Sequence, residues 1–338
     1  MISDLIQNKN VLLAFSDPAG AKAVLSFASV NRNSFKSVVA VSDRIYEFYS
    51  DFDFVVETYG NKTNEEWLSD SHVDLIITGT SFPLNLEVSL ISEATKRNIS
   101  SFSFIDHWVN FRKRFQIADA LVLPSWICVI DQRAFQLAKE EGLPSERILV
   151  TGNPYYEFLA SWKTQINRTD FLTKLGLPSD ALYVLYAPEP ISSFGLQEKY
   201  GFTEIDGINM IYEKMYPILG QNIYIIIKGH PNQNDEVFLD FIIKQSDFRL
   251  KYFKNLDINT CSYYAECIFG FFSNSLIEAK IMGKLVIRPL MLLKDNFIDP
   301  IKEMESSTFL SYYEENKFVV AVSNLMKKIL LKSIEIKK

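Results

Sequence analysis

Residues 267–289 read CIFGFFSNSLIEAKIMGKLVIRP and contain the pattern that decides the fold. The apolar run 267–271 leads into a Ser-Asn-Ser turn at 273–275, and a helical pattern then continues to a second apolar run at 285–288. Gly283 ends the helical pattern, because glycine readily adopts the left-handed conformation that closes a helix. A strand, a crossover helix and a neighbouring strand follow one another in this order in an open α/β sheet.

The same alternation of apolar runs and helical patterns extends along both halves of the chain. Strands that are buried on both faces and joined by helices predict parallel sheets with right-handed crossovers. We therefore expect an α/β fold with two Rossmann-like domains at 1–160 and 161–320, and a closing helix at 321–338. The expected strands are 11–15, 37–41, 54–57, 74–78, 101–105, 120–123 and 148–151 in the first half, and 182–187, 223–228, 249–253, 267–271 and 285–288 in the second.

The composition is that of a globular protein with a sizeable core. The 338 residues are 48% hydrophobic and 22% charged, and the formal net charge is -6 at pH 7. Nucleic acid is not an expected partner, because binding to its backbone requires a basic surface. The cysteines lack the spacing of metal ligands and lie in apolar segments, so we expect buried free thiols at Cys128, Cys261 and Cys267.

The distribution of apolar residues predicts a cytoplasmic protein. The chain begins with a polar segment, and no apolar run approaches the ~20 residues needed to span a bilayer. The segment 318–338 alternates apolar clusters with lysines. We interpret it as an amphipathic closing helix; the alternative is a peripheral contact with the inner face of the plasma membrane.

Two motifs follow expected strands in the second half. The run 223–228 is followed by Gly229, His230 and Pro231, which places the imidazole at the carboxyl end of a strand. A histidine there can donate a hydrogen bond to a phosphate, and the alternative is a turn histidine that only caps the strand. The 273–275 turn starts a helix, where free backbone amides and the helix dipole favour a phosphate.

This arrangement resembles the donor-binding half of GT-B glycosyltransferases: a strand, a serine-rich helix start, Glu278-Ala279, Gly283-Lys284 and a new strand. With the upstream His230-Pro231, it is similar to bacterial capsule and teichoic acid enzymes, namely CDP-glycerol glycerophosphotransferases, polysialyltransferases and Kdo transferases. The resemblance covers 182–289 best and the first half only in layout. It implies two Rossmann-like domains whose parallel sheets face a central cleft.

The resemblance also implies roles for individual residues of the second half. His230, Ser273 and Ser275 would contact the donor phosphate, and Glu278 would accept hydrogen bonds from ribose hydroxyls. Glu189, in the loop after the first strand of this half, would face the nucleotide or the leaving sugar. The remaining donor-binding candidates are their neighbours Lys228, Pro231 and Asn274.

The loop after the first strand contains one candidate catalytic base. Asp17 lies there, and Gly20 would let a ligand approach the backbone closely. The loop resembles the acceptor-side loop of GT-B enzymes, in which an acidic residue can serve as the base. It departs from the acidic-acidic-Gly pattern that is more usual in those families.

A second candidate base follows the expected strand 101–105. Asp106 and His107 form an acid-histidine neighbour pair that could deprotonate a sugar hydroxyl. Arg112 and Arg114 could hold an anionic acceptor. The alternative for this segment is a solvated basic turn packed over Trp108. Thr80 ends another expected strand and either lines the cleft or belongs to an ordinary polar loop.

These observations predict the transfer of a sugar or polyol phosphate from an activated donor to a hydroxyl of a bacterial surface polysaccharide or its lipid-linked precursor. Asp106, which we favour, or Asp17 would be the base, and His230 with the 273–275 turn would stabilise the leaving group without a metal. A CMP- or CDP-linked donor is favoured, while uracil nucleotides and phosphoribosyl pyrophosphate remain open. No motif predicts a tightly bound cofactor or metal.

Three other functions are compatible with the same pattern. A phosphoribosyltransferase would use the same kind of anionic leaving group. A non-hydrolysing UDP-sugar 2-epimerase has the same two-domain layout and would work without an acceptor. A non-catalytic GT-B-like domain would bind glycans, or partners within a larger polymerase complex.

Overall fold

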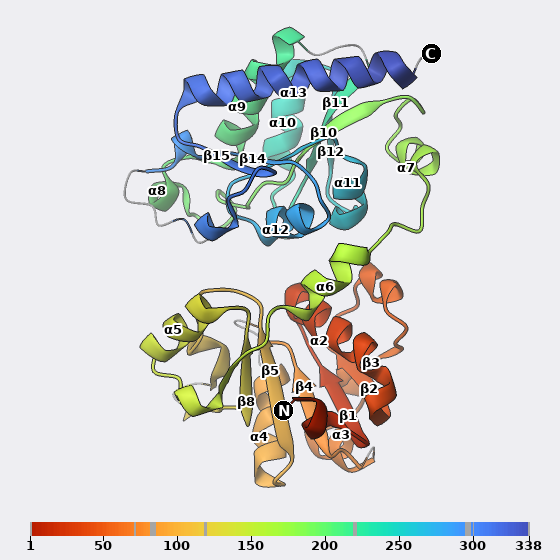
Figure 1. Ribbon diagram of the computed structural model, residues 1–338, viewed down its shortest axis with the longest axis vertical. Helices are drawn as coiled ribbons and strands as arrows, with labels where there is room; N and C mark the ends of the chain where they lie inside the picture. Colours follow the sequence, from red (N-terminus) through yellow and green to blue (C-terminus); the bar gives the residue numbers. More distant parts are fainter. Residues whose placement is uncertain are drawn as a thin grey trace. The chain divides into compact units, whose positions relative to one another are not determined.

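The computed structural model describes residues 2–70, 72–81, 86–117, 120–218, 222–294, 299 and 301–336, without the side chains of 2, 3, 303, 335 and 336. The chain forms two compact units, Met1–Phe158 and Leu159–Lys338, each built around a parallel sheet (Figure 1). This architecture confirms the predicted α/β class with two Rossmann-like units.

The sheet of the first unit has the strand order β3-β2-β1-β4-β5-β8-β9, with parallel neighbours throughout. The chain builds outward from β1 on one side and then crosses back to β4 on the other. The carboxyl ends of β1 and β4 therefore form the switch point, which is where ligands of such folds bind. The strands are β1 (Lys9–Ala14), β2 (Phe35–Ser42), β3 (Val56–Thr58), β4 (Leu75–Thr78), β5 (Ser100–Ile105), β8 (Trp126–Val129) and β9 (Ile148–Val150).

One predicted strand of this unit was wrong. Ala120–Leu121 pairs antiparallel with Gln116–Ile117 in a separate small hairpin, β7 with β6, and does not join the main sheet. The sheet takes up β8 (Trp126–Val129) instead. The run 120–129 is almost continuously apolar, so the sequence pattern alone does not show that Pro124 divides it. Two reciprocal hydrogen bonds between Ser101 and Ser125, each 3.1 Å, fix the position of β8 beside β5.

Helices α1 (Ile2–Ile6), α2 (Pro18–Val30), α3 (Asn64–Asp70), α4 (Leu86–Lys96), α5 (Gln132–Glu140) and α6 (Pro154–Ser161) accompany the first sheet, and α6 runs across the division between the units. One part of the core lies under α3 and α4, where Leu12, Trp67, Ile76 and Leu90 are almost completely buried. Helix α2 packs against β1, β4 and β5.

The second unit has the strand order β12-β11-β10-β13-β14-β15, again with parallel neighbours. Its switch point lies between β10 and β13. β15 was not expected from the sequence, because the run 309–312 is short and carries Ser311 and Tyr312. The strands are β10 (Leu182–Tyr186), β11 (Ile223–Lys228), β12 (Leu250–Phe253), β13 (Ile268–Phe269), β14 (Val286–Pro289) and β15 (Phe309–Tyr312).

The helices of the second unit are α7 (Arg168–Lys174), α8 (Gln197–Tyr200), α9 (Glu204–Met215), α10 (Glu236–Gln245), α11 (Ile258–Tyr264), α12 (Asn274–Ile281) and α13 (Glu315–Ile336). Helices α9, α10 and α13 pack together over one face of the sheet, while α11 and α12 pack against each other (Figure 1). Phe318 and Met326 of α13 are fully buried in this core. Cys128, Cys261 and Cys267 are buried and free, which confirms the prediction for the thiols.

The switch point of the first unit depends on two glycines. Gly20 is buried in the first turn of α2, and Gly79 follows β4. A Cβ on Gly79 would lie 2.7 Å from the Cα of Gly20, and a Cβ on Gly20 would lie 3.1 Å from the Cα of Gly79. Both atoms belong to the backbone, so neither can move aside cheaply. Gly20 therefore serves the packing of α2 against the β4 loop, in addition to any role at a ligand.

We expect Gly79→Ala to lower the free energy of unfolding by about 1–3 kcal/mol, because overpacking displaces backbone in this range. Urea unfolding followed by circular dichroism measures the change. Gly60→Ala is the matched control, since a Cβ at Gly60 meets nothing within 4 Å. Equal stability of the two variants would contradict the close packing of α2 and the β4 loop.

Candidate functional site

The carboxyl edge of the second sheet gathers most of the predicted donor-binding residues. Glu189 follows β10, His230 follows β11, and Ser273 follows β13 at the start of α12. β10 is hydrogen-bonded to both β11 and β13, and neighbouring strands lie ~4.8 Å apart, so the three loops leave the sheet side by side.

Glu189 joins the two strands of the switch point. Its Oε1 accepts the backbone N–H of Phe272 at 2.7 Å, while its Oε2 is buried and accepts no hydrogen bond from a described residue. Burial raises the pKa of Glu189, and the backbone amides of Phe272 and Ser273 partly offset that shift. The carboxyl group therefore presents one unused oxygen at the edge of the sheet.

His230 is held in a single tautomer. Its Nδ1 accepts the backbone N–H of Asn232 at 3.1 Å, so the proton of the neutral ring lies on Nε2. Burial lowers the pKa of His230 to about 4, and the charge of Lys228 adds to this effect. At neutral pH the ring is thus an uncharged donor through Nε2–H. Lys228 points its Nζ toward the carbonyl of Gly229 at 2.8 Å.

The start of α12 has the geometry of a capped helix. Ser273 is the N-cap; its Oγ accepts from the backbone N–H of Ser275 at 3.3 Å and from the Ser275 hydroxyl at 2.9 Å. The hydroxyl proton of Ser273 stays available to a ligand. Oδ1 of Asn274 is buried without a partner among the described residues. Glu278 is 8% exposed one turn further along the helix.

A buried polar network behind this edge was missed by the sequence analysis. Glu204, at the start of α9, is completely buried and accepts from the backbone N–H of Ser192 at 2.9 Å and from Nε2 of Gln233 at 2.5 Å. Gln233 also donates its backbone N–H to the carbonyl of His230 at 2.9 Å. The network ties the loop after β10 to the loop after β11. An acidic residue directly after Thr203 signalled only a helix start.

Three buried acceptors at this edge have no partner within the part of the chain that the structure describes: Oε2 of Glu189, Oε1 of Gln233 and Oδ1 of Asn274. A buried acceptor without a hydrogen bond costs about 1–3 kcal/mol, so such atoms mark a place where a ligand or water supplies donors. With the Nε2–H of His230 and the cap of α12, the edge can bind a group that carries both anionic oxygens and hydroxyl or amide donors.

The first unit brings Asp106, Arg114 and Thr80 together. Nη1 of Arg114 donates to Oδ1 of Asp106 at 3.0 Å and to Oγ1 of Thr80 at 2.9 Å, and Thr80 in turn donates to the carbonyl of Phe104. Asp106 is therefore a paired carboxylate in the structure. His107 beside it has a buried Nδ1 without a partner among the described residues, and burial lowers its pKa.

The two predicted arginines lie in different surroundings. Arg114 forms an ion pair with Asp106. Arg112 is exposed, and its backbone N–H donates to the carboxylate of Glu141 at 2.9 Å. Trp108 packs under the turn and donates its Nε1–H to Asp131 at 2.8 Å. The segment thus contains the buried tryptophan of the basic-turn alternative, while the binding of an anionic acceptor by Arg112 and Arg114 stays a prediction.

Glu87 is a buried carboxyl at the switch point of the first unit, and its position there was not predicted from the sequence. Its Oε1 accepts from the backbone N–H of Ser16 at 3.0 Å, and both of its oxygens lie 2.5 Å from the hydroxyl of Ser81. Burial raises the pKa of Glu87 to about 7, and the charge of Asp17 adds to the shift. The only signal in the sequence was an acidic residue between Leu86 and Val88.

Asp17 and Glu87 form a pair of carboxyl groups in unlike environments. Asp17 is half-buried at the N-cap of α2, where its side chain makes no cap hydrogen bond. Glu87 is 1% exposed. Enzymes separate a proton donor from a proton acceptor in this way, because the buried carboxyl keeps its proton to higher pH than the wetter one.

Two global features complete the description of the site. Among the described residues, no group of three or more His, Cys, Asp or Glu side chains is placed to hold a metal ion. Within the same residues, every helix is too short or too polar to cross a membrane.

Comparison with known proteins establishes the type of fold. No protein-family model and no curated protein matches the sequence. The chain is similar to the UDP-GlcNAc 2-epimerase of Methanocaldococcus jannaschii, with a TM-score of 0.62, 13% identity and coverage of 94% of this chain and 92% of that one. It is also similar to the enzyme of Neisseria meningitidis bound to UDP-GlcNAc, with a TM-score of 0.62, 14% identity and coverage of 97% and 100%.

A third similar structure is a putative UDP-N-acetylglucosamine 2-epimerase from Listeria monocytogenes, with a TM-score of 0.66, 12% identity and coverage of 94% and 88%. At this level of identity, the likeness establishes the fold. The chain therefore has a GT-B-like fold. The narrower resemblance to capsule and teichoic acid enzymes stays a prediction.

We expect Glu87→Gln to change the pH dependence of stability. The native pKa of Glu87 lies above the ordinary value of 4.5, so its contribution to stability is full below pH 4.5 and is lost as pH rises through about 7. Glutamine does not ionise, so the difference in stability between wild type and variant should be largest below about pH 4.5, shrink between pH 4.5 and about 7, and stay level above that. Urea midpoints across this range measure it.

Glu93→Gln, on the same helix, provides the control. Hydrogen bonds from Arg97 and Lys96 lower the pKa of Glu93 below the ordinary 4.5, so its contribution is already full at pH 4.5 and the cost of this variant should stay constant up to pH 8. If the cost of Glu87→Gln stays constant between pH 4.5 and 8, Glu87 does not titrate in this window.

Proposed function

We propose that the chain is an enzyme that acts on a UDP-activated sugar and inverts one carbon of that sugar, as a UDP-sugar 2-epimerase does. The observation that carries the proposal is the carboxyl edge of the second sheet, where His230, the start of α12 and three buried acceptors without a partner among the described residues lie on neighbouring loops. Structures with the same fold are described as complexes with UDP-GlcNAc and UDP, and with UDP-glucose.

The edge suits a nucleoside diphosphate for specific reasons. The diphosphate is anionic, and it would accept from the Nε2–H of His230, from the Ser273 hydroxyl and from the amino end of α12. Ribose hydroxyls and an amide N–H of the base would supply the donors that Glu189, Gln233 and Asn274 lack. Glu278, one turn into α12, would take ribose hydroxyls. In this proposal Pro231 fixes the backbone that leaves His230.

The extent of the fold likeness favours epimerisation over transfer to a glycan. The match covers 88–100% of the similar epimerase structures and 94–97% of this chain. Inversion at a sugar carbon requires removal of a hydrogen and its return to the opposite face. That chemistry needs an acid and a base, for which Asp17 and Glu87 are suited because one carboxyl is half-buried and the other is almost completely buried. Asp106, engaged by Arg114, is better suited to holding substrate hydroxyls.

His230→Ala should weaken the binding of UDP by roughly 10- to 100-fold while the far-ultraviolet circular dichroism stays unchanged, because one hydrogen bond to a charged group is lost. Calorimetric titration with UDP, CDP, CMP, GDP and phosphoribosyl pyrophosphate measures the loss and the choice of nucleotide. His72→Asn is the control, since His72 is exposed in the first unit and has a positive φ of 44° that asparagine tolerates.

If His230→Ala binds the preferred nucleotide as tightly as wild type does, the donor assignment fails. Tighter binding of CMP or CDP than of UDP would favour the predicted transferase, which uses a CMP- or CDP-linked donor, over the epimerase. Preference for phosphoribosyl pyrophosphate would favour a phosphoribosyltransferase.

The reaction itself is tested without any acceptor. We expect wild type to convert UDP-GlcNAc in D₂O to a second UDP-sugar and to place deuterium at the inverted carbon, because the removed proton exchanges with solvent. Proton nuclear magnetic resonance follows both changes. Asp17→Asn should lower turnover by roughly 100- to 10,000-fold, and Asp106→Asn less.

Each result assigns a function. Tight nucleotide binding without deuterium uptake, but with UDP release once a glycan is added, would replace epimerisation by glycosyl transfer. Binding without any turnover would leave a non-catalytic GT-B-like domain. Loss of turnover in Asp106→Asn, with normal turnover in Asp17→Asn, would identify Asp106 as the base.

A further inference from the structure

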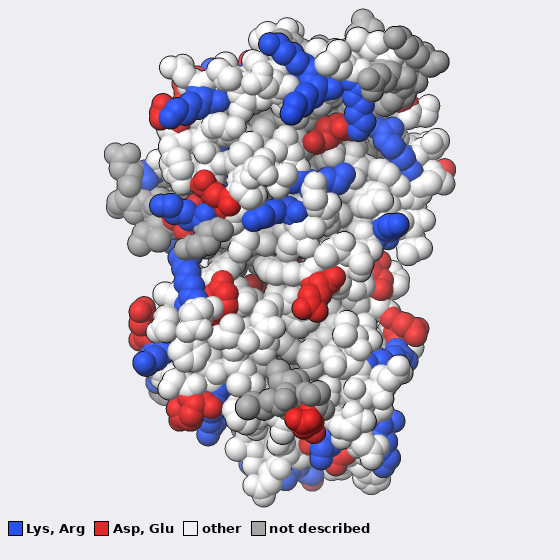
Figure 2. Space-filling view, in the orientation of Figure 1, with Lys and Arg blue, Asp and Glu red and all other residues white. Residues whose placement is uncertain are grey.

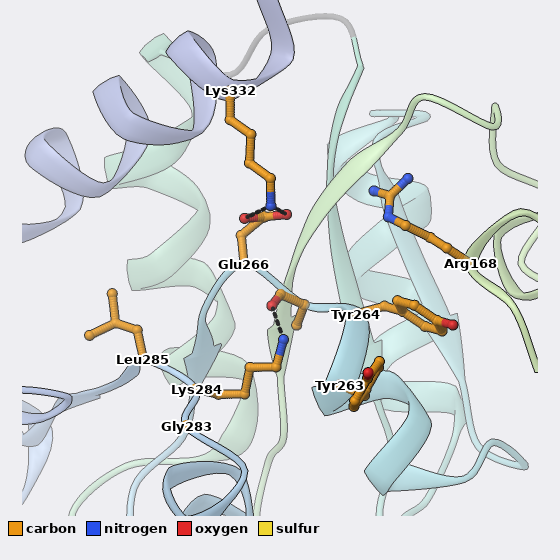
Figure 3. Close-up of a pocket in the computed structure, with 9 residues that line it drawn as sticks. Arg168, Tyr263, Tyr264, Glu266, Gly283, Lys284, Leu285 and Lys332 are labelled. Carbon is orange, nitrogen blue, oxygen red and sulfur yellow. Dashed lines mark hydrogen bonds and ion pairs between the residues drawn. The ribbon is translucent and has the colours of Figure 1, made fainter. Parts of the chain in front are cut away.

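A cavity of about 440 Å³ lies in the second unit (Figure 3), and the positions of its residues along the strands place it at the other end of the sheet from the candidate site. Glu266 precedes β13 and Leu285 precedes β14, so the cavity opens at the amino ends of these strands, whereas Glu189 and Ser273 lie at carboxyl ends. Its walls come from α7, α11, the end of α12 and α13. The lining residues are Arg168, Tyr263, Tyr264, Ala265, Glu266, Gly283, Lys284, Leu285 and Lys332.

Lys284 is fixed in this cavity by the way α12 ends. Gly283 has a φ of +75°, and the backbone N–H groups of Gly283 and Lys284 donate to the carbonyls of Lys280 and Ala279. This is the Schellman arrangement, in which the residue after the glycine leaves the helix in one direction. The Lys284 side chain then runs beside the ring of Tyr263, with Nζ 5.4 Å from its centroid.

The ammonium group of Lys284 is half-buried, and its hydrogen bonding is weak. Its hydrogen bond is a long one of 3.5 Å to the carbonyl of Ala265, and no described carboxylate forms an ion pair with it. Burial lowers the pKa of Lys284, and the charge of Lys332 adds to this effect against the opposing charge of Glu266. A desolvated cation in this condition gains more from an anion than a surface lysine does.

The other charged residues of the cavity do not neutralise the charge of Lys284. Nζ of Lys332, on α13, donates to both carboxylate oxygens of Glu266, at 2.7 and 2.8 Å. Arg168 of α7 donates to the carbonyls of Ser179 and Ala181, which are uncharged partners, and it forms no ion pair among the described residues. Three cations therefore share one carboxylate. Figure 3 shows Lys332 reaching Glu266 from α13, while Lys284 extends from the turn that follows α12 and Arg168 lies on the side of Tyr264.

We propose that this cavity is a second ligand site, separate from the sugar-nucleotide site, and that it binds a phosphate group. Lys284 and Arg168 supply the uncompensated charges, and Lys332 would join them when it leaves Glu266. Tyr263 and Tyr264 supply the flat walls against which the organic part of a phosphate ester can lie.

The phosphate can belong to a soluble ester or to a phospholipid headgroup. Helix α13 is the reason to consider a phospholipid headgroup. It bears Lys332, and its side chains Leu331 and Ile334 are 63% and 54% exposed. Figure 2 shows further lysine and arginine side chains over the part of the second unit that α13 covers. Anionic headgroups attract such a surface, and exposed leucine and isoleucine can enter the headgroup region.

The site is tested on the unmodified wild-type chain. Lysines are labelled with acetic anhydride at constant ionic strength, in rising concentrations of inorganic phosphate, and each site is read by peptide mass spectrometry. Phosphate at ten times its dissociation constant should reduce the labelling of Lys284 roughly tenfold, by mass action. Lys317 is the internal control, because it lies on α13, is exposed and is already paired with Glu314. Because the readout is specific to one lysine, phosphate bound at His230 does not affect it.

A second arm replaces phosphate by vesicles of phosphatidylglycerol or of phosphatidylcholine. Protection of Lys284 by phosphate alone assigns a soluble phosphate ester, and protection only by the phosphatidylglycerol vesicles assigns a headgroup. Lys284→Gln should abolish the phosphate-dependent rise in melting temperature that remains in a His230→Ala background, while Lys317→Gln should keep it. Unchanged labelling of Lys284 in every arm, or an undiminished rise in Lys284→Gln, would overturn the proposal.

Discussion

The hydrogen bond between the carboxylate of Glu189 and the backbone N–H of Phe272 spans the switch point of the second sheet, and the candidate site depends on it. β10 is the central strand, with β11 on one side and β13 on the other, so the chain must leave this edge in opposite directions. A buried carboxylate held by backbone amides fixes the two diverging loops against each other. Because the donor is backbone, the bond depends on the length of the Glu189 side chain, which must reach from the loop after β10 to the loop after β13.

Buried polar groups on both sides of this bond fix the loops further. Arg288 of β14 is completely buried; its Nε donates to the carbonyl of Phe271 at 2.6 Å, while its other nitrogens contact Asp299 and Ser311. On the other side, Glu204 holds Ser192 and Gln233. Buried ion pairs and networks add little net stability but are costly to break at one partner. Their effect here is positional, since they hold the turns that carry Ser273 and His230.

The sequence predicted the elements of the fold well because parallel strands are apolar on both faces and stand out from amphipathic helices. It failed where an apolar run was divided by Pro124, and where β15 carried polar residues. Strand ends located His230, Glu189 and Ser273, because position at a carboxyl edge follows from order along the chain. Glu87, Glu204 and Gln233 could not be found this way. Each has at least one partner that lies 12 to 71 positions away, and burial of a polar side chain has no local signature.

The division of polar groups between the units limits the chemistry that either could perform alone. The second unit has groups suited to a diphosphate, and its buried carboxyl groups are engaged in its loops: Glu189 accepts from Phe272, and Glu204 accepts from Ser192 and Gln233. The first unit has the pair Asp17 and Glu87, whose unlike environments suit proton transfer, and its arginine at the switch point, Arg114, is already paired with Asp106. In the reaction proposed above, the nucleotide would bind to residues of the second unit, and the proton would move between residues of the first.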